Sequence, residues 1–533
     1  KRRRVLDLKI AGGQVLDGTG APAVRADVGV TGDSITAVGD LSREPAGEIV
    51  DAAGLTVAPG FIDMHSHSDW RLFANRRAES KIRQGVTTEV VGNCGFSPAP
   101  ISDEFRGDMD GFALYVGPGM DFSWRSVKDY LRRYEDGGLA LNVAQLIGHG
   151  TLRLAVMGFA RRAPSAKELA RMRSLMESAM ADGACGLSTG LIYAPGSYSE
   201  TPEIVEIARG AARGGFYASH IRGEGATLLD SVAEAIRVGE EGGLPVQVSH
   251  IKAAGRPHWG RVKDALALID AARARGLDVT ADVYPYTASS TTIRTLLPDS
   301  ALEGGIGAML GRLRDSAARA RIRDEMAHGA VLARGVGWGD IMIAYAPSKP
   351  EVQGLRLDEI GRRWGKDPVE CAFDIIEAEK GKGYVILFQL DEADLRKALV
   401  HPHVMIGSDG SSLAATGPLS EGKPHPRSYG TFPRVLGRYA RDEGVLTLPA
   451  AIHKMTGMPA ARLGLKDRGV IRPGAKADVV AFSPGRVADL ATYEDPHRYA
   501  AGIEHVIVNG RAVVRGGEHT GNLPGRVLRP SAG

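Results

Sequence analysis

The sequence contains few cysteines, little net charge and no long apolar run, and each absence narrows the possibilities. Three cysteines among 533 residues are an odd and sparse set, which argues against a disulfide framework and fits a reducing compartment. The 66 basic and 63 acidic residues leave a formal net charge of +3, too small on this length to suggest nucleic acid as a partner. No apolar run approaches the roughly 18 residues of a membrane span. We therefore expect a cytoplasmic protein that binds neither nucleic acid nor membrane.

One local charge cluster runs against that expectation, the basic tract Lys1-Arg2-Arg3-Arg4. Such a tract can serve nucleic-acid binding or targeting, but it is also common as a solvated segment before a first strand. No apolar region of signal-peptide length follows it. We interpret the tract as a solvated segment.

The chain has ample material for a large globular core. Hydrophobic residues make up 43% and charged residues 24% of it, proportions typical of globular proteins. Its length of 533 residues exceeds one ordinary compact domain, so we expect a large domain and a smaller one. The 69 glycines suit a fold with many strand-to-helix turns.

Both ends of the chain carry short strand-like runs. The runs are Val5–Ile10, Asp27–Thr31, Ser34–Val38, Asp478–Phe482, His505–Val508 and Arg511–Val514. The dipeptide Asn509-Gly510 separates the last two runs and is a strong hairpin signal. We expect residues 1–57 and 462–533 to form one small β-sandwich module built from both chain ends.

The middle of the chain alternates short apolar runs with longer helical segments. Over residues 226–242, Leu228, Val232 and Ile236 share one helical face, while Asp230 lies on the other. Alternation of this kind predicts βα units around a parallel sheet, and eight units predict an α/β fold with a closed (β/α)8 barrel over residues 58–461. The eight runs are Phe61–His67, Val86–Gly92, Asn142–Gly148, Ala184–Ser188, Gly215–His220, Pro245–His250, Asp278–Tyr284 and His403–Ser408.

The seventh and eighth runs are separated by residues 285–402, a stretch long enough for more than one helix. We interpret this stretch as an insertion over the mouth of the barrel that carries part of a substrate pocket.

Metal-binding side chains gather at the ends of the strand-like runs. His65 and His67 lie two residues apart, so in a strand both imidazoles point the same way. The C-terminal strand ends of a (β/α)8 barrel surround a single cavity. A lone strand-end histidine has an ordinary structural explanation, whereas six ligand-type residues on five strands indicate a metal site. The six are His65, His67, Cys94, His220, His250 and Asp409.

The order of these residues resembles the amidohydrolase superfamily, and within it the N-acyl-D-amino-acid deacylases (D-aminoacylases). Many binuclear members use a carboxylated lysine on the fourth strand, but residues 186–190 here read Gly-Leu-Ser-Thr-Gly. Cys94 offers a thiolate instead, as in the D-aminoacylase branch. The similar blocks are Pro59–His67, Gly92–Gly95, Ser188–Tyr193, Ser219–Glu224, Ser249–Lys252, Gly407–Gly410 and His425–Gly430.

The resemblance implies one tight metal site and a weaker neighbouring site. The tight set is Cys94, His220 and His250, and the weaker set is His65, His67 and Asp409. Zinc suits thiolate and imidazole ligands, and it lowers the pKa of a bound water to about 7. Asp409 is then the candidate general base, which takes the water proton and returns it to the leaving amine; the alternative is that it only binds metal.

A product amino acid carries a carboxylate, which an arginine fork or a lysine would bind. Surface ion pairs are the alternative explanation for such cations. The candidate substrate-binding residues are Tyr193, Arg222, Lys252, Tyr284, Ser290 and Arg427. The resemblance favours Tyr193, Lys252 and Tyr284 among them. Cys185 and Cys371 are expected to be inert buried thiols, and His149 to be structural.

The resemblance implies hydrolysis of small-molecule N-acyl-D-amino acids to a D-amino acid and a carboxylate. Cyclic amides of the hydantoinase and dihydroorotase kind are an alternative, which the missing fourth-strand lysine disfavours. Dipeptides and lactams are further alternatives. A non-enzymatic scaffold on an inactive barrel is disfavoured because all six candidate ligands are present. The sequence leaves the oligomeric state open, a homo-oligomer included, along with the acyl group and the side chain of the substrate.

Overall fold

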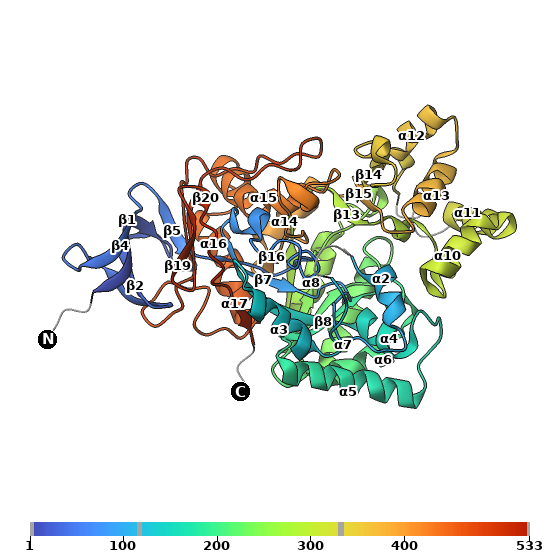
Figure 1. Cartoon of the computed structure of the whole chain (residues 1–533), viewed down its shortest axis with the longest axis horizontal. Coiled ribbons are helices and arrows are strands. Elements are labelled where there is room, and N and C mark those ends of the chain that lie inside the picture. The colour runs from blue at the N-terminus through green and yellow to red at the C-terminus, as the bar shows by residue number, and fades with distance from the viewer. Residues whose placement is uncertain (1–4, 115–119, 329–334, 530–533) are drawn as a thin grey trace.

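The computed structural model describes residues 5–114, 120–328 and 335–529. At its centre eight parallel strands form a nearly closed barrel, with helices around it (Figure 1). The strands are β6 (Phe61–Asp63), β7 (Val86–Val91), β8 (Asn142–Gly148), β9 (Gly186–Gly190), β10 (Phe216–His220), β11 (Val246–Val248), β12 (Val279–Val283) and β16 (Val404–Ile406). Each overlaps one of the eight predicted runs, so the predicted fold class is confirmed.

The strands follow the chain order around the barrel, with β6 and β16 at the two ends of the hydrogen-bonded path. Between those two strands the contact is made by the segments that follow them. The amide of Asp409 donates to the carbonyl of His65 at 2.7 Å, and Ser66 and Gly410 form an isolated parallel bridge. We call this contact between residues 63–68 and 407–412 the seam.

Two of the helices around the barrel show how the sequence sets their bounds and their buried face. α5 (Ala166–Asp182) starts with a capping box in which Ser165 accepts from the Glu168 amide, and it stops at Gly183, whose φ of 112° favours glycine. α7 (Leu228–Gly242) buries Leu228, Val232 and Ile236, the face that its periodicity predicts. The other long helices on the barrel are α3 (Val127–Gly137), α4 (His149–Met157), α6 (Thr201–Ala208), α8 (Val262–Ala274), α14 (Glu392–Val400) and α16 (Leu448–Met455).

Side chains pack on both sides of the barrel wall. Phe216 and Ala218 of β10 join an inner cluster with Met64 and Met405, whereas the intervening Tyr217 packs into the outer layer against helices. This alternation fills the barrel interior, so only its mouth can hold a ligand.

Strands from the two chain ends share a second, nine-stranded sheet. Its order is β20-β19-β18-β17-β5-β1-β2-β3, with β4 beside β1, and it lies to the left in Figure 1. The bounds are β1 (Leu6–Val15), β2 (Val24–Thr31), β3 (Ser34–Gly39), β4 (Ala46–Asp51), β5 (Thr56–Pro59), β17 (Val479–Phe482), β18 (Ile503–Val508), β19 (Arg511–Arg515) and β20 (Glu518–His519). Asn509 and Gly510 both have positive φ, 47° and 79°, in the predicted hairpin turn.

The stretch between β12 and β16 forms a lobe with its own core, at the upper right in Figure 1. Its three antiparallel strands are β13 (Ser289–Thr292), β15 (Tyr384–Leu387) and β14 (Ile341–Tyr345), in that order. Its helices are α9 (Asp299–Leu302), α10 (Gly305–Arg314), α11 (Ser316–His328), α12 (Leu357–Trp364) and α13 (Pro368–Ala378). The sequence predicted helices here but not this sheet.

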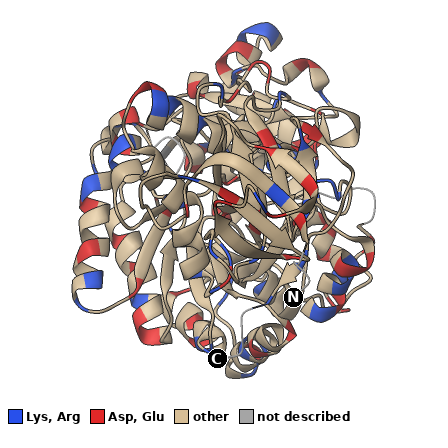
Figure 2. Cartoon of the chain, turned by 90° about the vertical axis from the view of Figure 1, so that its left-hand side faces the viewer, with Lys and Arg blue, Asp and Glu red and all other residues tan. Residues whose placement is uncertain are grey.

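Charged residues are spread rather than gathered. Figure 2 shows basic and acidic bands alternating along the outer helices of the face in view. Within the part of the chain that the structure describes, no helix has the length and apolar character needed to cross a membrane.

Candidate active site

The six predicted metal ligands meet at the C-terminal end of the barrel. Potential ligand atoms of His65, His67, Cys94 and Asp409 all lie within 4.8 Å of one another, and so do those of Cys94, His220 and His250. Cys94 therefore belongs to both groups. We call Cys94, His220 and His250 the ladder set, because they follow strands joined by continuous pairing, and His65, His67 and Asp409 the seam set.

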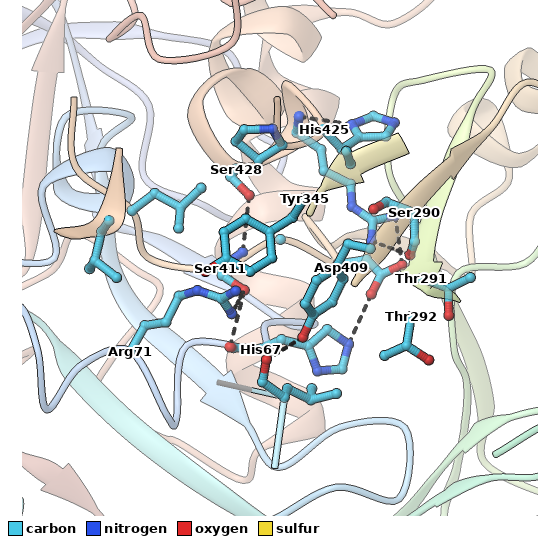
Figure 3. Close-up of a pocket in the computed structure, with 18 of the residues that line it drawn as sticks. His67, Arg71, Ser290, Thr291, Thr292, Tyr345, Asp409, Ser411, His425 and Ser428 are labelled. Atoms are coloured by element: carbon cyan, nitrogen blue, oxygen red, sulfur yellow. Dashed lines mark hydrogen bonds and ion pairs between the residues drawn. The ribbon is translucent and has the colours of Figure 1, made fainter. Parts of the chain in front are cut away.

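Contacts within this cluster are short and buried. The Cys94 Sγ lies 3.3 Å from His65 Nε2 and 3.6 Å from His250 Nε2. Asp409 Oδ1 lies 3.0 Å from His67 Nε2, a contact visible in Figure 3, and 3.4 Å from His65 Nε2. The side chains therefore converge on one small volume, as the ligands of a metal must.

Electrostatics favour the metal-binding forms of Cys94 and His220, whereas the anionic groups beside His65, His67 and His250 raise the pKa of these rings against the effect of burial. Burial alone would raise the pKa of the Cys94 thiol, but His65 and His67 beside it hold that pKa well below its usual range. Burial lowers the pKa of His220, which keeps this ring neutral near pH 7. Neither ring nitrogen of His220 makes a hydrogen bond to the described part of the chain, although the residue is only 5% exposed. A thiolate and a neutral imidazole whose ring nitrogens make no hydrogen bond are groups that zinc binds, so these residues fit the ion.

The backbone is held in an unusual conformation at three of the six residues. Cys94, His250 and Asp409 have φ values of 54°, 37° and 49°, in the left-handed region that side chains seldom adopt. Such conformations cost free energy and persist where the surrounding structure enforces them, often at functional sites. Two residues before Cys94, the chain passes so close to β8 that a Cβ added at Gly92 would lie 2.0 Å from the carbonyl oxygen of Leu146.

Two buried carboxylates that the sequence reasoning missed lie beside the histidines. Asp282 of β12 places Oδ1 3.2 Å from His65 Nδ1 and accepts the His250 amide at 2.8 Å. Glu224 places Oε1 3.1 Å from His250 Nδ1. A carboxylate on Nδ1 leaves Nε2 of a histidine free for metal, so both residues can orient ligands. The available signals were an acidic residue inside a strand-like run and another at the end of the block Ser219–Glu224.

The predicted base and one predicted cation form a buried pair. Arg427 Nη1 lies 2.8 Å from Asp409 Oδ2, and Arg427 Nη2 donates to the carbonyl of Ser290 at 3.1 Å. Burial alone would raise the pKa of Asp409, but Arg427 and the nearby histidines hold it well below its usual range. The ionised form of Asp409 is therefore favoured, which suits a metal ligand, while the lowered pKa makes the carboxylate a weaker proton acceptor.

A pocket opens beside this pair, lined by barrel loops and by the lobe (Figure 3). The predicted substrate residues Tyr193, Ser290 and Arg427 line it together with His67, Cys94 and Asp409. The sequence reasoning did not identify several other lining residues: Arg71, Phe96, Leu114, Thr291, Thr292, Tyr345, Tyr384, Leu413, Leu419, Glu421 and His425.

Three other predicted substrate residues lie outside the lining of this pocket. Arg222 forms a two-pronged pair with Glu234 of α7, at 3.0 and 2.8 Å. Lys252 Nζ is held by Glu224 at 2.5 Å and by the carbonyl of His250 at 2.7 Å. Tyr284 lies between two cations, with Lys252 5.6 Å and Arg427 4.8 Å from its ring centre. Lys252 and Tyr284 thus contact His250 and Arg427, respectively, rather than line this pocket.

The remaining polar residues of interest have structural surroundings. His149 Nε2 contacts Glu203 at 2.9 Å, and Arg153 pairs with the same carboxylate at 2.6 Å. Cys185 is buried, and burial raises the pKa of its thiol to about 12. Cys371 is buried in α13.

Known proteins share this arrangement along the whole chain. Residues 48–514 match the family described as Amidohydrolase family. D-aminoacylase of Alcaligenes xylosoxydans xylosoxydans is 41% identical over 99% of this chain and 98% of the relative. N-acyl-D-glutamate deacylase of the same organism is 40% identical over 99% of this chain and 97% of the relative.

Solved structures agree with these relatives. One is a D-aminoacylase with a binuclear metal center, for which one-metal activation and second-metal attenuation are described. Its TM-score is 0.84 at 40% identity. The match covers 98% of this chain and 100% of that one. N-acyl-D-glutamate deacylase of Bordetella bronchiseptica, complexed with zinc and a phosphonate mimic of the tetrahedral intermediate, has a TM-score of 0.84 at 37% identity. That match covers 99% of this chain and 100% of the other.

Proposed function

This chain belongs to the amidohydrolase family, in the branch of the D-aminoacylases, and on that premise we propose that it hydrolyses N-acyl-D-amino acids with the help of zinc. The products are a D-amino acid and a carboxylate. The single observation that carries the proposal is the convergence of the six ligand-type residues beside the Asp409–Arg427 pair in one pocket. Likeness to the deacylases over 99% of the chain supports the substrate class.

The metal would be held first by the ladder set, and a second ion would lie at the seam set. When bound, zinc polarises the scissile carbonyl and makes water a better nucleophile near neutral pH. Thiolate ligation by Cys94 supports zinc over magnesium or calcium, which prefer oxygen ligands.

Asp409 supplies the proton transfers in this proposal. Its ionised carboxylate takes a proton from the attacking water and returns it to the nitrogen of the leaving amine as the amide bond breaks. Arg427 lines the pocket, and its guanidinium already contacts Asp409 and the carbonyl of Ser290, so an α-carboxylate of the substrate would share this cation with them. The hydroxyl groups of Tyr193 and Ser290 line the same pocket and can donate to the substrate.

Cyclic amides remain the second candidate, with less support. The strand β9 carries no lysine between Gly186 and Gly190, which is the bridging position in many binuclear relatives of that kind. We also propose that the protein acts in the cytoplasm, because a reactive buried thiolate and two further free cysteines suit a reducing compartment.

Amine release from matched N-acetyl-D- and N-acetyl-L-amino acids tests the function, with zinc content determined on the same sample before and after chelation. Cleavage of the D series only, lost with zinc and restored by it, is expected. Bound zinc without cleavage of either enantiomer would contradict the substrate class and direct attention to cyclic amides.

A further inference from the structure

A buried ionic network lies directly beneath the seam set, and the proposed chemistry does not use it. Lys81 of α1 (Glu79–Ile82) is fully buried, and its Nζ donates to Asp63 Oδ2 at 2.6 Å and to Ser408 Oγ at 2.5 Å. Glu89 of β7 lies 3.3 Å from the same ammonium. Burying charges is costly, so a pairing of this kind needs a compensating function or geometry.

The network is bonded to the backbone of both arms that carry the seam set. Asp63 Oδ1 accepts the Ser408 amide at 2.8 Å and the His65 amide at 3.3 Å. Ser408 Oγ donates to Asp63 Oδ2 at 2.6 Å and accepts the Gly410 amide at 3.0 Å. Asp409 lies between Ser408 and Gly410, so its left-handed turn is fixed from both sides.

A second set of bonds fixes the histidine arm. Glu89 Oε1 accepts from Ser66 Oγ at 2.6 Å and from Ser68 Oγ at 2.7 Å, and these two residues flank His67. The arms also approach closely, since a Cβ added at Gly407 would lie 2.7 Å from the Cβ of His65. The strands β6 and β16 do not pair with each other, and the seam has only the short bridge of Ser66 and Gly410, so these side chains supplement the few backbone hydrogen bonds there.

We propose that Lys81, Asp63 and Ser408 are positioning residues that act mainly on the metal affinity of the seam set, with a smaller effect on the ladder set, to which Cys94 joins it. The inference rests on the proposed metal site and adds that different residues position its two sets of ligands. Outer partners of metal ligands commonly change metal affinity by about 10–100-fold when removed. The network touches the arms of His65, His67 and Asp409, whereas the ladder set has its own support.

The ladder set offers a matched control. Ser188 of β9 is fully buried like Ser408, and its Oγ donates to the carbonyl of Gly92 at 2.5 Å and accepts the Gly95 amide at 3.1 Å. These bonds fix the turn that carries Cys94. Ser188→Ala and Ser408→Ala therefore each remove one buried hydroxyl from the support of one set.

Calorimetric titration of zinc into the chelator-treated full chain, for wild type and both variants, tests the proposal. We expect two equivalents in wild type. Ser408→Ala should weaken the second equivalent by about tenfold or more and leave the first nearly unchanged, while Ser188→Ala should weaken the first. Equal weakening of both equivalents by Ser408→Ala, or a single equivalent in wild type at saturating zinc, would overturn the proposal. Absence of zinc binding in wild type would instead contradict the proposed function.

Lys81→Met combined with Asp63→Asn removes one cation and one anion together and serves as the stronger variant. It should lose the second equivalent while thermal unfolding in zinc-free buffer still shows one cooperative transition. Retention of both equivalents by a folded double variant would count against the network as a positioning device. Measuring binding rather than turnover separates this result from any effect on catalysis.

Discussion

The two sets of candidate ligands occupy one cavity but are built in different ways. His220 ends β10 in register with Gly190 of β9, and the amide of Ser249 beside His250 donates to the carbonyl of Ser219 at 2.9 Å. Hydrogen bonds between neighbouring strands therefore position the ladder set. The seam set lies on the segments that follow β6 and β16, which do not pair with each other. A short backbone bridge and the buried network of charges and serines hold these segments together.

Cys94 lies within ligand distance of both sets, so its removal should have the largest effect. Cys94→Ala should lower zinc affinity by more than about 100-fold, because even groups that only orient ligands contribute about 10–100-fold. Activity should fall to background, and metal analysis after dialysis checks the loss. Cys185→Ala removes another buried thiol and should keep both zinc and activity. Full zinc retention by Cys94→Ala would show that Cys94 is not a metal ligand.

Removal of the candidate base Asp409 should lower turnover without releasing the zinc that the ladder set holds. Asp409→Asn preserves the size of the side chain, yet it should lower kcat by about 10²–10⁴-fold because the proton acceptor is gone. The tightly bound zinc should remain. Steady-state kinetics with zinc analysis on the same sample provides the measurement. A kcat near that of wild type would remove Asp409 from the mechanism.

The carboxylate beside His250 should matter less than a ligand but still measurably. Glu224→Gln weakens the acceptor on Nδ1, and the affinity of the ladder set for zinc should fall by about 10–100-fold. Glu234→Gln is the matched control, because Glu234 of α7 pairs with Arg222 rather than with a candidate metal ligand. If both variants bind zinc like wild type, Glu224 does not orient the ligand.

The smallest effect is expected at Arg222. Because its guanidinium is occupied by Glu234, Arg222→Ala should change KM by less than about twofold, as for an ordinary surface ion pair. Arg427→Ala should raise KM by about tenfold or more, because a charge-assisted hydrogen bond contributes about 1.5–3 kcal/mol. Comparable KM values for the two variants would contradict the placement of the substrate carboxylate at Arg427.

The barrel could be predicted because its signal is local and repeated. Each apolar run is a strand buried on both sides, and a ligand-type residue at the end of a run needs no partner to be noticed. Of the three lobe strands, β13 reads Ser-Ser-Thr-Thr, which carries neither apolar alternation nor an apolar run. The strands β14 and β15 read Ile-Met-Ile-Ala-Tyr and Tyr-Val-Ile-Leu, which are apolar runs that the sequence interpretation did not assign to a sheet.

Residues whose role depends on neighbours distant in the sequence could not be predicted in the same way. Lys81 lies on a four-residue helix and reads as an ordinary surface lysine, and only the fold brings it to Asp63 and Ser408. The roles of Glu224 and Asp282 likewise depend on the histidines that the fold places beside them. The pairing of Arg222 with Glu234 shows the converse, because its proximity to His220 in the sequence does not bring its guanidinium to the pocket.

The position of the metal tests the account most directly. Anomalous diffraction at the zinc edge from crystals of the purified protein should give a peak about 2.0–2.3 Å from Cys94 Sγ and from one nitrogen each of His220 and His250. A second, weaker peak among His65, His67 and Asp409 would match the expected difference in affinity between the two sets. Zinc located elsewhere, with the six side chains left without metal, would contradict the account.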